Sequence, residues 1–437
     1  LQKGFGCVGD YHGYIGNALA LQTSLDRLSA CGAAVLVPAH GEPMDRPTEA
    51  TALLRERLVA LWRNHAATSS LNHYFPSLYA DLAQDPDRLP RAESREPPAH
   101  VRRVGYTSFA VLAESGAVLL IDCGDVSVVD ELQRWLDVGN VDGAPVSSVD
   151  LCWVTHYHDD HVDGLPVLQE RLGCSVSTEE HMTEILEQPS RFFLPCLSPA
   201  VARDVIGRRD GERWRWHEYT LTAYHFPGQT YYHSGLLVEG HGVTLFFAGD
   251  SGSPTGIDDH NCANRCHGGA GRGIRRCVQI WRETRPDYVF NEHQERAFRF
   301  SDAQLDHLDA MLVRRAALLA AMLPWPHPDM GSDDGWLRAY PYEQEVTRGE
   351  TCGLDVQVTN HTQSPLAIRA EAVLPPAWAT AQCEGAVVEV PAAADGAARL
   401  RISVPASADA GLYVLSLRVT VDGRYLGQVR HALVRVR

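Results

Sequence analysis

The segment 155–161 concentrates the side chains that could do chemistry, with three histidines and two aspartates among His156, Tyr157, His158, Asp159, Asp160 and His161. It directly follows the apolar run 151–154, which predicts a strand that ends here. Side chains two residues apart in extended backbone point the same way, so His156 and His158 can bind one metal ion. Asp160 and His161 project from the following turn and can reach a second ion. A polar surface loop is the alternative, but this density of ligands at a strand end favours a metal site.

The surrounding sequence predicts the layers that must hold this segment in place. Apolar runs at 111–113, 117–122, 149–155, 243–248 and 286–291 are typical of buried strands. The segments 165–172 and 301–322 have the apolar spacing of helices. Strands that alternate with helices place the helices against the faces of a sheet, so residues 100–330 are predicted to form an α/β domain.

Two further regions flank this central domain. Residues 1–95 predict a short buried strand at 33–37 and an amphipathic helix at 49–64, followed by a polar linker that contains Pro97 and Pro98. Residues 341–437 contain short alternating β-runs separated by turn residues such as Asp422 and Gly423, which predicts a β-sandwich. Nothing in this C-terminal region resembles a catalytic motif.

The first region resembles the end of a second copy of the central domain. Asp10 belongs to a Gly-Asp pair and His40 follows an apolar strand, and Asp250 and His293 repeat this order later in the chain. The region lacks its own His-rich motif, so its residues cannot complete a two-metal site. We interpret them as remnants of such a site or as the end of a truncated domain, with chance similarity as the alternative.

The pattern His-x-His-x-Asp-His after an apolar strand resembles the metallo-β-lactamase superfamily over residues 100–330. Asp122-Cys123-Gly124, Ala248-Gly249-Asp250 and His293 follow in the order of that family. The resemblance implies a four-layer αββα sandwich, here joined to an all-β, immunoglobulin-like C-terminal sandwich. It also implies a set of site residues. His156 and His158 would bind the first ion, and Asp160, His161 and His293 would bind the second. Asp250 would bridge both ions, and Asp160 would also orient the nucleophile. Asp122, Thr155 and Asp159 would support the ligand imidazoles.

One motif departs from the family pattern. Where the family has Pro-Gly-His-Thr, this chain has Pro227-Gly228-Gln229-Thr230, so an amide replaces the third imidazole of the first ion. An amide oxygen is a harder and weaker donor for Zn²⁺ than imidazole is. We expect His233 to take this position; Gln229 itself, or a first site with only two ligands, remains open. His225, at the start of the same segment, is a candidate for a supporting or substrate contact.

These residues predict two divalent ions, Zn²⁺ by expectation, with iron or manganese as alternatives. Two cations that share a water lower its pKa enough to supply hydroxide near neutral pH. The predicted function is therefore hydrolysis of an ester, lactone, amide or thioester bond in a small or medium substrate. An iron-dependent oxidoreductase or dioxygenase on the same fold is the second hypothesis. A binding or scaffold protein with a vestigial metal site is the third.

A second cluster lies in the Gly-rich stretch 258–272. His260, Cys262, Cys266 and His267 could bind a structural Zn²⁺. A loop that lines the substrate pocket, or a disulfide between Cys262 and Cys266, is the preferred interpretation. His100, His361 and His431 stand outside any motif and are predicted to be surface residues.

The composition limits the partners of the chain. Its 437 residues carry a formal charge of −16, which disfavours a nucleic-acid partner because phosphate binding requires clustered Lys and Arg. No apolar run is long enough to predict a membrane-spanning helix. The eleven scattered cysteines are typical of reduced thiols, which predicts a cytoplasmic protein, although a leader could precede Leu1. We expect a small-molecule substrate, and the sequence does not indicate an oligomeric state.

Overall fold

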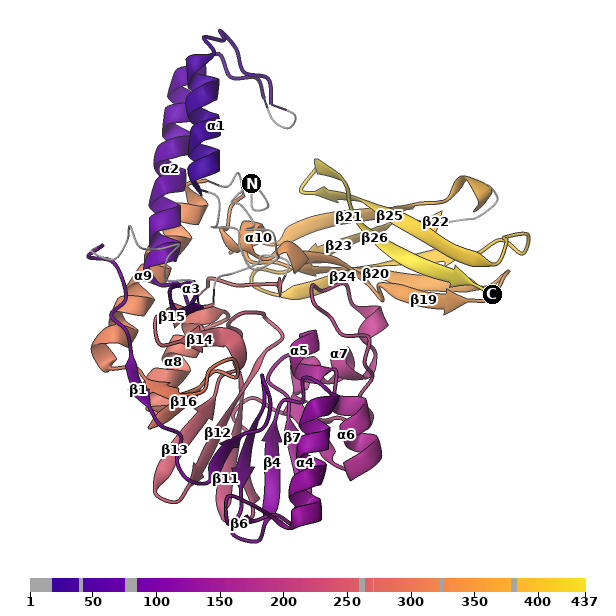
Figure 1. Ribbon diagram of the computed structural model, residues 1–437. Helices are drawn as coiled ribbons and strands as arrows, with labels where there is room; N and C mark the ends of the chain where they lie inside the picture. The colour runs from indigo at the N-terminus through magenta and orange to yellow at the C-terminus, as the bar shows by residue number, and fades with distance from the viewer. Residues whose placement is uncertain are drawn as a thin grey trace.

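The computed structural model describes residues 18–38, 42–74, 85–258, 264–269, 271–322, 325–378 and 383–437. Its central part contains two mixed sheets packed face to face, with helices on both outer faces (Figure 1). The C-terminal part is a separate β domain. The predicted boundary at 341 lies within this domain, because its first strand already begins at Leu337.

The first sheet has six strands in the order β2 (Val101–Arg103), β3 (Phe109–Leu112), β4 (Ala117–Ile121), β7 (Ser148–Trp153), β8 (Ser175–Glu179) and β9 (Ile206–Arg208). Alternate residues of β4 serve two cores. Val118 and Leu120 pack against helices α4 (Val126–Val138) and α6 (Leu165–Leu172). Leu119 and Ile121 face the second sheet. The strands predicted at 117–122 and 149–155 and the helix predicted at 165–172 are therefore confirmed.

The second sheet has seven strands in the order β1 (Glu93–Arg95), β17 (Ala297–Arg299), β16 (Tyr288–Phe290), β13 (Val243–Phe247), β12 (Ser234–Gly240), β11 (Tyr219–His225) and β10 (Arg213–Trp216). Phe246 and Val289 pack on its outer face against α8 (Ile274–Thr284) and α9 (Asp302–Ala320). Phe247 and Phe290 point to the core between the sheets. Three apolar layers therefore separate four structural layers, as the αββα prediction requires.

The N-terminal helices α1 (Ala18–Ala30) and α2 (Pro47–Ala67) form a hairpin that projects from the body of the molecule, followed by the short α3 (Leu71–Tyr74) (Figure 1). The helix predicted at 49–64 is confirmed as part of α2. The buried strand predicted at 33–37 is wrong, because Val35 and Val37 are 49% and 77% exposed and Leu36 makes only an isolated bridge to Met44. An apolar run of this length packs as a strand only where a sheet offers it an edge. Asp10 and His40 lie outside the described residues.

The C-terminal domain contains two sheets around one apolar core. One has the order β18 (Leu337–Tyr340), β20 (Thr351–Thr359), β24 (Asp395–Ser403) and β22 (Cys383–Glu384). The other has the order β19 (Glu343–Val346), β26 (Arg424–Val436), β25 (Gly411–Val421), β21 (Leu366–Val373) and β23 (Ala386–Val390). The predicted turn at Asp422 and Gly423 joins β25 to β26, and both residues have positive φ. The strands curl into a half-barrel, and the finer immunoglobulin-like assignment stays a prediction.

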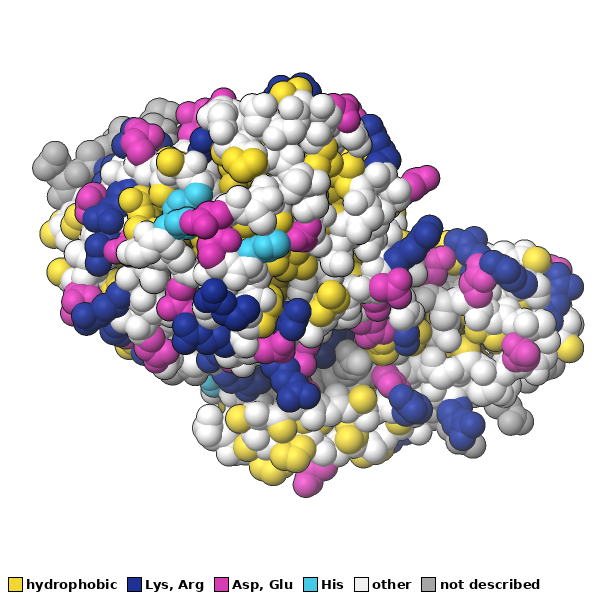
Figure 2. All heavy atoms as spheres, turned by 90° about the horizontal axis from the view of Figure 1, so that it is seen from below, with side chains coloured by type: hydrophobic (Ala, Val, Ile, Leu, Met, Phe, Trp, Pro, Cys, Tyr) yellow, Lys and Arg dark blue, Asp and Glu magenta, His cyan; other side chains and the backbone are white. Residues whose placement is uncertain are grey.

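Short elements complete the described chain. They are β5 (Asn140–Val141), β6 (Ala144–Pro145), α5 (Asp159–Val162), α7 (Thr183–Glu187), β14 (Gly252–Ser253), β15 (Gly256–Ile257), α10 (Asp329–Ser332), and the 3-10 turns Glu180–Met182, Pro189–Arg191, Gly249–Ser251, Asp334–Trp336 and Pro376–Trp378. Among the described helices, none combines the length and the apolar character needed to cross a membrane. On the face in Figure 2, acidic and basic side chains are interspersed.

Candidate metal centre

The His-rich motif begins where β7 ends and continues into the one-turn helix α5. Its backbone is held from both sides. His156 makes an isolated bridge with His233, and the amide of Ser234 donates to the carbonyl of Thr155 at 2.6 Å. On the other side His158 makes a bridge with Leu197. The extended backbone before α5 therefore comes from pairing with two segments that are distant in the sequence.

The Asp122 carboxylate forms hydrogen bonds with two residues of the His-rich motif, Thr155 and His161. This carboxylate is completely buried and accepts hydrogen bonds from the amide and hydroxyl of Thr155 at 2.7 and 2.6 Å. It also lies 2.8 Å from Nδ1 of His161. The Thr155 hydroxyl, which donates to Asp122, lies 3.0 Å from Nδ1 of His156. One carboxylate thus places the Nδ1 proton of both imidazoles, directly or through Thr155, and leaves both Nε2 atoms available to a ligand.

Two groups of ligand atoms converge above Asp122, each with its atoms within 4.8 Å of one another. The first contains His156, His158 and Asp250, with Nε2 of His156 3.1 Å from Nδ1 of His158 and 3.8 Å from Oδ2 of Asp250. The second contains Asp160, His161 and His293. Asp250 lies between the groups. Its Oδ1 is 3.4 Å from Nε2 of His161, and its Oδ2 is 3.2 Å from Nε2 of His293.

This geometry fits bound cations. Ligand atoms about 2.0–2.1 Å from a tetrahedral Zn²⁺ lie about 3.3 Å from one another, which is close to the spacing of these atoms. Nε2 of His161 and Oδ1 of Asp250 are buried and make no hydrogen bond. These two atoms face each other at 3.4 Å and attract only when His161 is protonated, and a cation at this place would satisfy both. A third group, formed by Asp122, His156 and His161, is occupied by the hydrogen bonds that fix the imidazoles.

The electrostatics of the site follow from buried imidazoles beside carboxylates. Burial and the neighbouring histidines hold the pKa of His156 well below its usual value, and burial lowers that of His158 to about 4. Burial also opposes protonation of His293, but the carboxylates of Asp250 and Asp160 outweigh it and raise its pKa to about 10. Burial alone would raise the pKa of Asp250, yet His293 and His161 hold it well below its usual range. Without metal, protons therefore neutralise the second group.

Gln229 points into the first group, whereas His233 does not belong to either group. The amide nitrogen of Gln229 donates to Oδ2 of Asp250 at 3.2 Å and to Oδ2 of Asp258 at 2.6 Å. Its Oε1 is buried without a hydrogen bond. The ring of His233 instead stacks on His156, with centroids 4.7 Å apart and planes inclined by 12°. Stacked rings hold their nitrogen lone pairs in separate, nearly parallel planes, so these two imidazoles do not converge on one point.

Two other predicted residues lie apart from the ligands. Asp159 is exposed, and its carboxylate accepts a hydrogen bond from the amide of Asp160. Nε2 of His225 lies 2.8 Å from the carbonyl of Tyr231, and its ring stacks on His181. Neither residue supports a ligand imidazole through these contacts.

Sequence reasoning missed two buried acids. Asp258 lies in the stretch that the sequence predicts as a pocket-lining loop, and its contact with Gln229 depends on two loops that meet in space. Glu292 is fully buried next to His293, with neither carboxylate oxygen hydrogen-bonded. Burial, together with the charge of Asp122, raises the pKa of Glu292 well above its usual value. The burial of Glu292 could not be predicted from its place before His293, because a single acidic residue next to a metal ligand can be either buried or exposed.

The open side of the centre is formed by the second group. The side chains of Asp160 and His293 are 41% and 18% exposed, whereas His156, His161 and His233 have no exposed surface. Tyr106, which is 70% exposed, lies edge-on to the ring of His293 at 5.2 Å. The centre is therefore accessible from the side of Asp160, His293 and Tyr106.

Comparison with known proteins matches two parts of the chain. Residues 118–268 match the family model of the beta-lactamase superfamily domain, and residues 346–422 match that of the NPCBM-associated NEW3 domain of alpha-galactosidase. Hydroxyacylglutathione hydrolase of Aeromonas hydrophila subsp. hydrophila is 32% identical over 136 residues, which is 30% of this chain and 43% of that protein. The enzyme of the same name from Aeromonas salmonicida is 26% identical over 133 residues, or 30% and 41%. The chain thus spans less than half the length of these relatives.

Among solved structures, a metallo-β-lactamase from Cronobacter sakazakii matches with a TM-score of 0.38 and 18% identity, over 54% of this chain and 95% of that one. The metallo-β-lactamase MIM-1 from Novosphingobium pentaromativorans matches with a TM-score of 0.38 and 16% identity, over 54% and 92%. By the two family models, the chain contains a beta-lactamase superfamily domain and a C-terminal NEW3-type β domain.

Proposed function

We propose that this chain is a metal-dependent hydrolase that cleaves an ester, lactone, amide or thioester bond in a small or medium-sized substrate. The observation that carries the proposal is the convergence of two ligand groups on either side of Asp250. The names of the similar Aeromonas enzymes support a thioester as the first substrate class to test.

In this proposal His156 and His158 hold the first of two divalent ions, and Asp160, His161 and His293 hold the second. Asp250 lies between them. Bound there, two cations would supply a water of lowered pKa and a Lewis acid for the substrate's carbonyl oxygen. Asp122 and Thr155 fix the imidazole protons so that Nε2 of His156 and His161 face the ions. With the ions bound, Asp160, whose side chain is 41% exposed at the open side, would also orient the attacking water.

We further propose Gln229, rather than His233, as the third group of the first ion. Asp250 and Asp258 hold its amide nitrogen, which leaves Oε1 buried without a hydrogen bond; both ring nitrogens of His233 are also buried without one, so the stacking of that ring separates the two candidates. His233 would have to leave its stack on His156 before it could share an ion with that residue. The expected consequence is a first site with weaker preference for Zn²⁺ than three imidazoles would give.

The main experiment counts metal ions per chain by mass spectrometry and measures hydrolysis of a hydroxyacyl-glutathione thioester, a lactone and an aryl ester. We expect about two ions in the wild type and the loss of about one in His161→Ala. His217→Ala is the matched control, because this histidine pairs with Asp150 outside both ligand groups and should lose neither metal nor activity. A wild-type chain that binds no metal and hydrolyses none of these substrates would contradict the proposal.

A second experiment separates Gln229 from His233. Gln229→His should tighten Zn²⁺ binding at the first site, because imidazole replaces an amide oxygen. His233→Ala should leave the number of bound ions unchanged. Loss of one ion on His233→Ala would instead assign the third position to His233.

An iron-dependent oxidoreductase is the second candidate, and the amide at position 229 is the observation that favours it. A site with fewer imidazoles and harder oxygen donors suits iron better than a three-histidine site does. Purification with one equivalent of iron, and no hydrolysis, would favour this candidate.

A further inference from the structure

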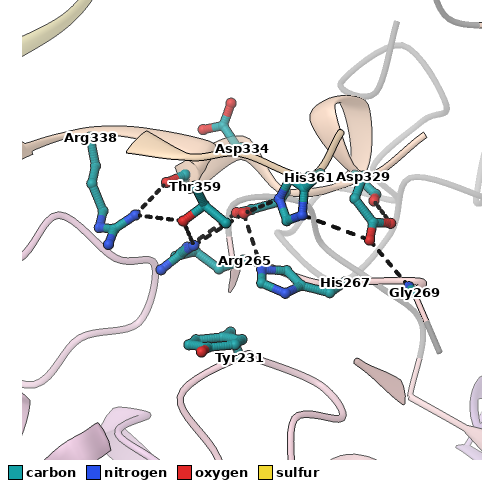
Figure 3. Close-up of polar contacts among 12 residues, drawn as sticks. Tyr231, Arg265, His267, Gly269, Asp329, Asp334, Arg338, Thr359 and His361 are labelled. Carbon is teal, nitrogen blue, oxygen red and sulfur yellow. Dashed lines mark hydrogen bonds and ion pairs between the residues drawn. The ribbon is translucent and has the colours of Figure 1, made fainter. Parts of the chain in front are cut away.

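We infer that the C-terminal β domain is a positioning element of the metal centre, because it fixes the loop that holds Gln229. The contacts meet at Asp333, a fully buried residue just before the first C-terminal strand. Figure 3 shows Arg265 and His267 from the metallo-β-lactamase domain, Asp329 from the connecting segment, and Thr359 and His361 from the β domain close together. Three of these side chains, Arg265, His267 and His361, contact the Asp333 carboxylate directly.

Arg265 is the main link between the domains. Its guanidinium donates from Nε and Nη2 to the two oxygens of Asp333, each at 3.1 Å. The same Nη2 donates to the hydroxyl of Thr359 at the end of β20, at 3.0 Å. Arg265 is only 3% exposed, so removal of any one partner leaves a buried charge with fewer hydrogen bonds.

Two imidazoles also contact the Asp333 carboxylate. Nε2 of His267 and Nε2 of His361 each lie 3.0 Å from Oδ2 of Asp333. His361 is 4% exposed, so its prediction as a surface residue is wrong: the neighbouring domain covers it. Ligand atoms of these three residues lie close enough together to hold a cation. A dication here would meet the Arg265 guanidinium, which already occupies both oxygens of Asp333, so we assign an electrostatic network instead.

The backbone of the same loop is fixed by the connecting segment. The amides of Gly268 and Gly269 donate to the two carboxylate oxygens of Asp329 at 2.8 and 3.1 Å. Gly335 leaves room for the Arg265 side chain, since a Cβ at this position would lie 2.5 Å from its Cγ and Cδ. Residues 264–269 are therefore held by charge, by hydrogen bonds and by shape.

Residues 264–266 of this loop form hydrogen bonds with the turn that carries Gln229. The thiol of Cys266 lies 3.1 Å from the carbonyl of Gln229, and the hydroxyl of Thr230 donates to the carbonyl of Asn264 at 2.7 Å. The amide of Tyr231 donates to the carbonyl of Arg265 at 3.0 Å. Gln229 in turn contacts Asp250 and Asp258. Three successive residues of the turn thus depend on a loop whose outer side is bound by the β domain.

A second contact of the β domain reaches the other flank of the centre. The amide of Tyr342 donates to the carbonyl of Arg191 at 2.7 Å, and the Arg191 guanidinium lies 4.7 Å from the ring centre of Tyr340. A few residues further on, the carbonyl of Cys196 accepts from the amide of Asp159 in the His-rich motif at 3.0 Å. The β domain therefore supports two segments that each contact the metal centre.

The test is hydrogen–deuterium exchange of the full chain with Thr359→Val, His361→Leu and both together. We expect backbone amides of 264–269 and of 227–233 to exchange about tenfold faster, because each change removes a hydrogen bond to a buried charged group. Helix α8 and strand β25 should keep their wild-type exchange. Arg399→Ala is the control, since its pair with Asp355 lies on the exposed face of the same β domain.

Unchanged exchange in the two segments would overturn the inference, and so would equal acceleration in every segment, which indicates general destabilisation. A second readout is the rate at which a chelator removes the bound ions, and this part rests on the proposed function. It should rise in the double variant, and faster loop exchange without faster metal loss would refute the link to the metal centre. If the chain binds no metal, the proposed function fails, while the exchange result still decides whether the β domain fixes the loop.

Discussion

Asp122→Asn should weaken metal binding while it preserves the shape of the site. Asp122 accepts from the amide and hydroxyl of Thr155 and from Nδ1 of His161, at 2.6–2.8 Å. An asparagine can keep one oxygen toward the Thr155 amide, but its NH₂ group then faces the other two donors. The Thr155 hydroxyl can rotate and accept. His161 can accept only by moving its proton to Nε2, the atom that faces Asp250.

This tautomer has no lone pair at Nε2 for a cation. The corresponding loss of metal affinity is about 10- to 100-fold, the usual effect of losing a carboxylate partner behind a ligand imidazole. The metal-free protein should lose about 1–3 kcal/mol of its free energy of unfolding, because hydrogen bonds to a buried carboxylate are replaced by weaker ones to a neutral amide. Metal affinity depends on which nitrogen of His161 carries the proton, whereas stability depends on the strength of the hydrogen bonds at position 122.

Metal affinity is measured by competition with a chromophoric chelator, and stability by urea unfolding of the metal-free protein. Asp125→Asn is the matched control. Asp125 is a nearby exposed acid that caps α4 through the amide of Ser127, so its loss should cost about 1 kcal/mol or less and leave the affinity unchanged. Wild-type metal affinity in Asp122→Asn, or equal losses in both variants, would refute the reasoning.

Three further predictions concern stability. The metal-free protein should be most stable near neutral pH. The pKa of His293 is raised to about 10, so the stability that its protonation contributes is lost as the pH rises from about 6.5 to 10. The pKa of His233 is lowered to about 3, so stability falls as the pH drops below about 6.5; each effect is at most about 1.4 kcal/mol per pH unit. Urea unfolding at about pH 5, 6.5 and 9 should give a maximum, and a flat profile would contradict these assignments. Gly249→Ala should lower thermal stability strongly, because Gly249 has a φ of +53° and a Cβ there would lie 2.5 Å from the ring of His233. Gly242→Ala is the control: its φ is also positive but the space around it is open, so it should cost only about 1 kcal/mol. Arg315→Met should loosen the packing of α2 on α9, because the buried guanidinium of Arg315 donates to Asn64 and Thr68. Limited proteolysis should then cleave the helical hairpin faster. An unchanged cleavage rate would show that apolar packing alone holds the hairpin on α9.

Local patterns in the sequence were sufficient for the motif and most of its supporting elements. The spacing of His156, His158, Asp160 and His161 after an apolar strand depends only on backbone periodicity, and the structure places all four side chains in the two ligand groups. Apolar runs likewise predicted β4, β7, β13 and α6, because a buried strand or helix leaves a period in its own sequence. The run at 33–37 had the same composition but lies exposed, since composition cannot supply a neighbouring edge.

Contacts between distant segments were decided by the tertiary structure alone. Whether Gln229 or His233 faces the first group depends on a stacked ring and on two carboxylates from other loops. The buried Asp333 network joins residues from two domains, and nothing in the sequence around His361 distinguishes it from a surface histidine. Sequence therefore determined which residue types follow which strand. The packing of loops and domains determined which polar atoms are left without a partner, because the cost of burying such an atom depends on all of its neighbours in space.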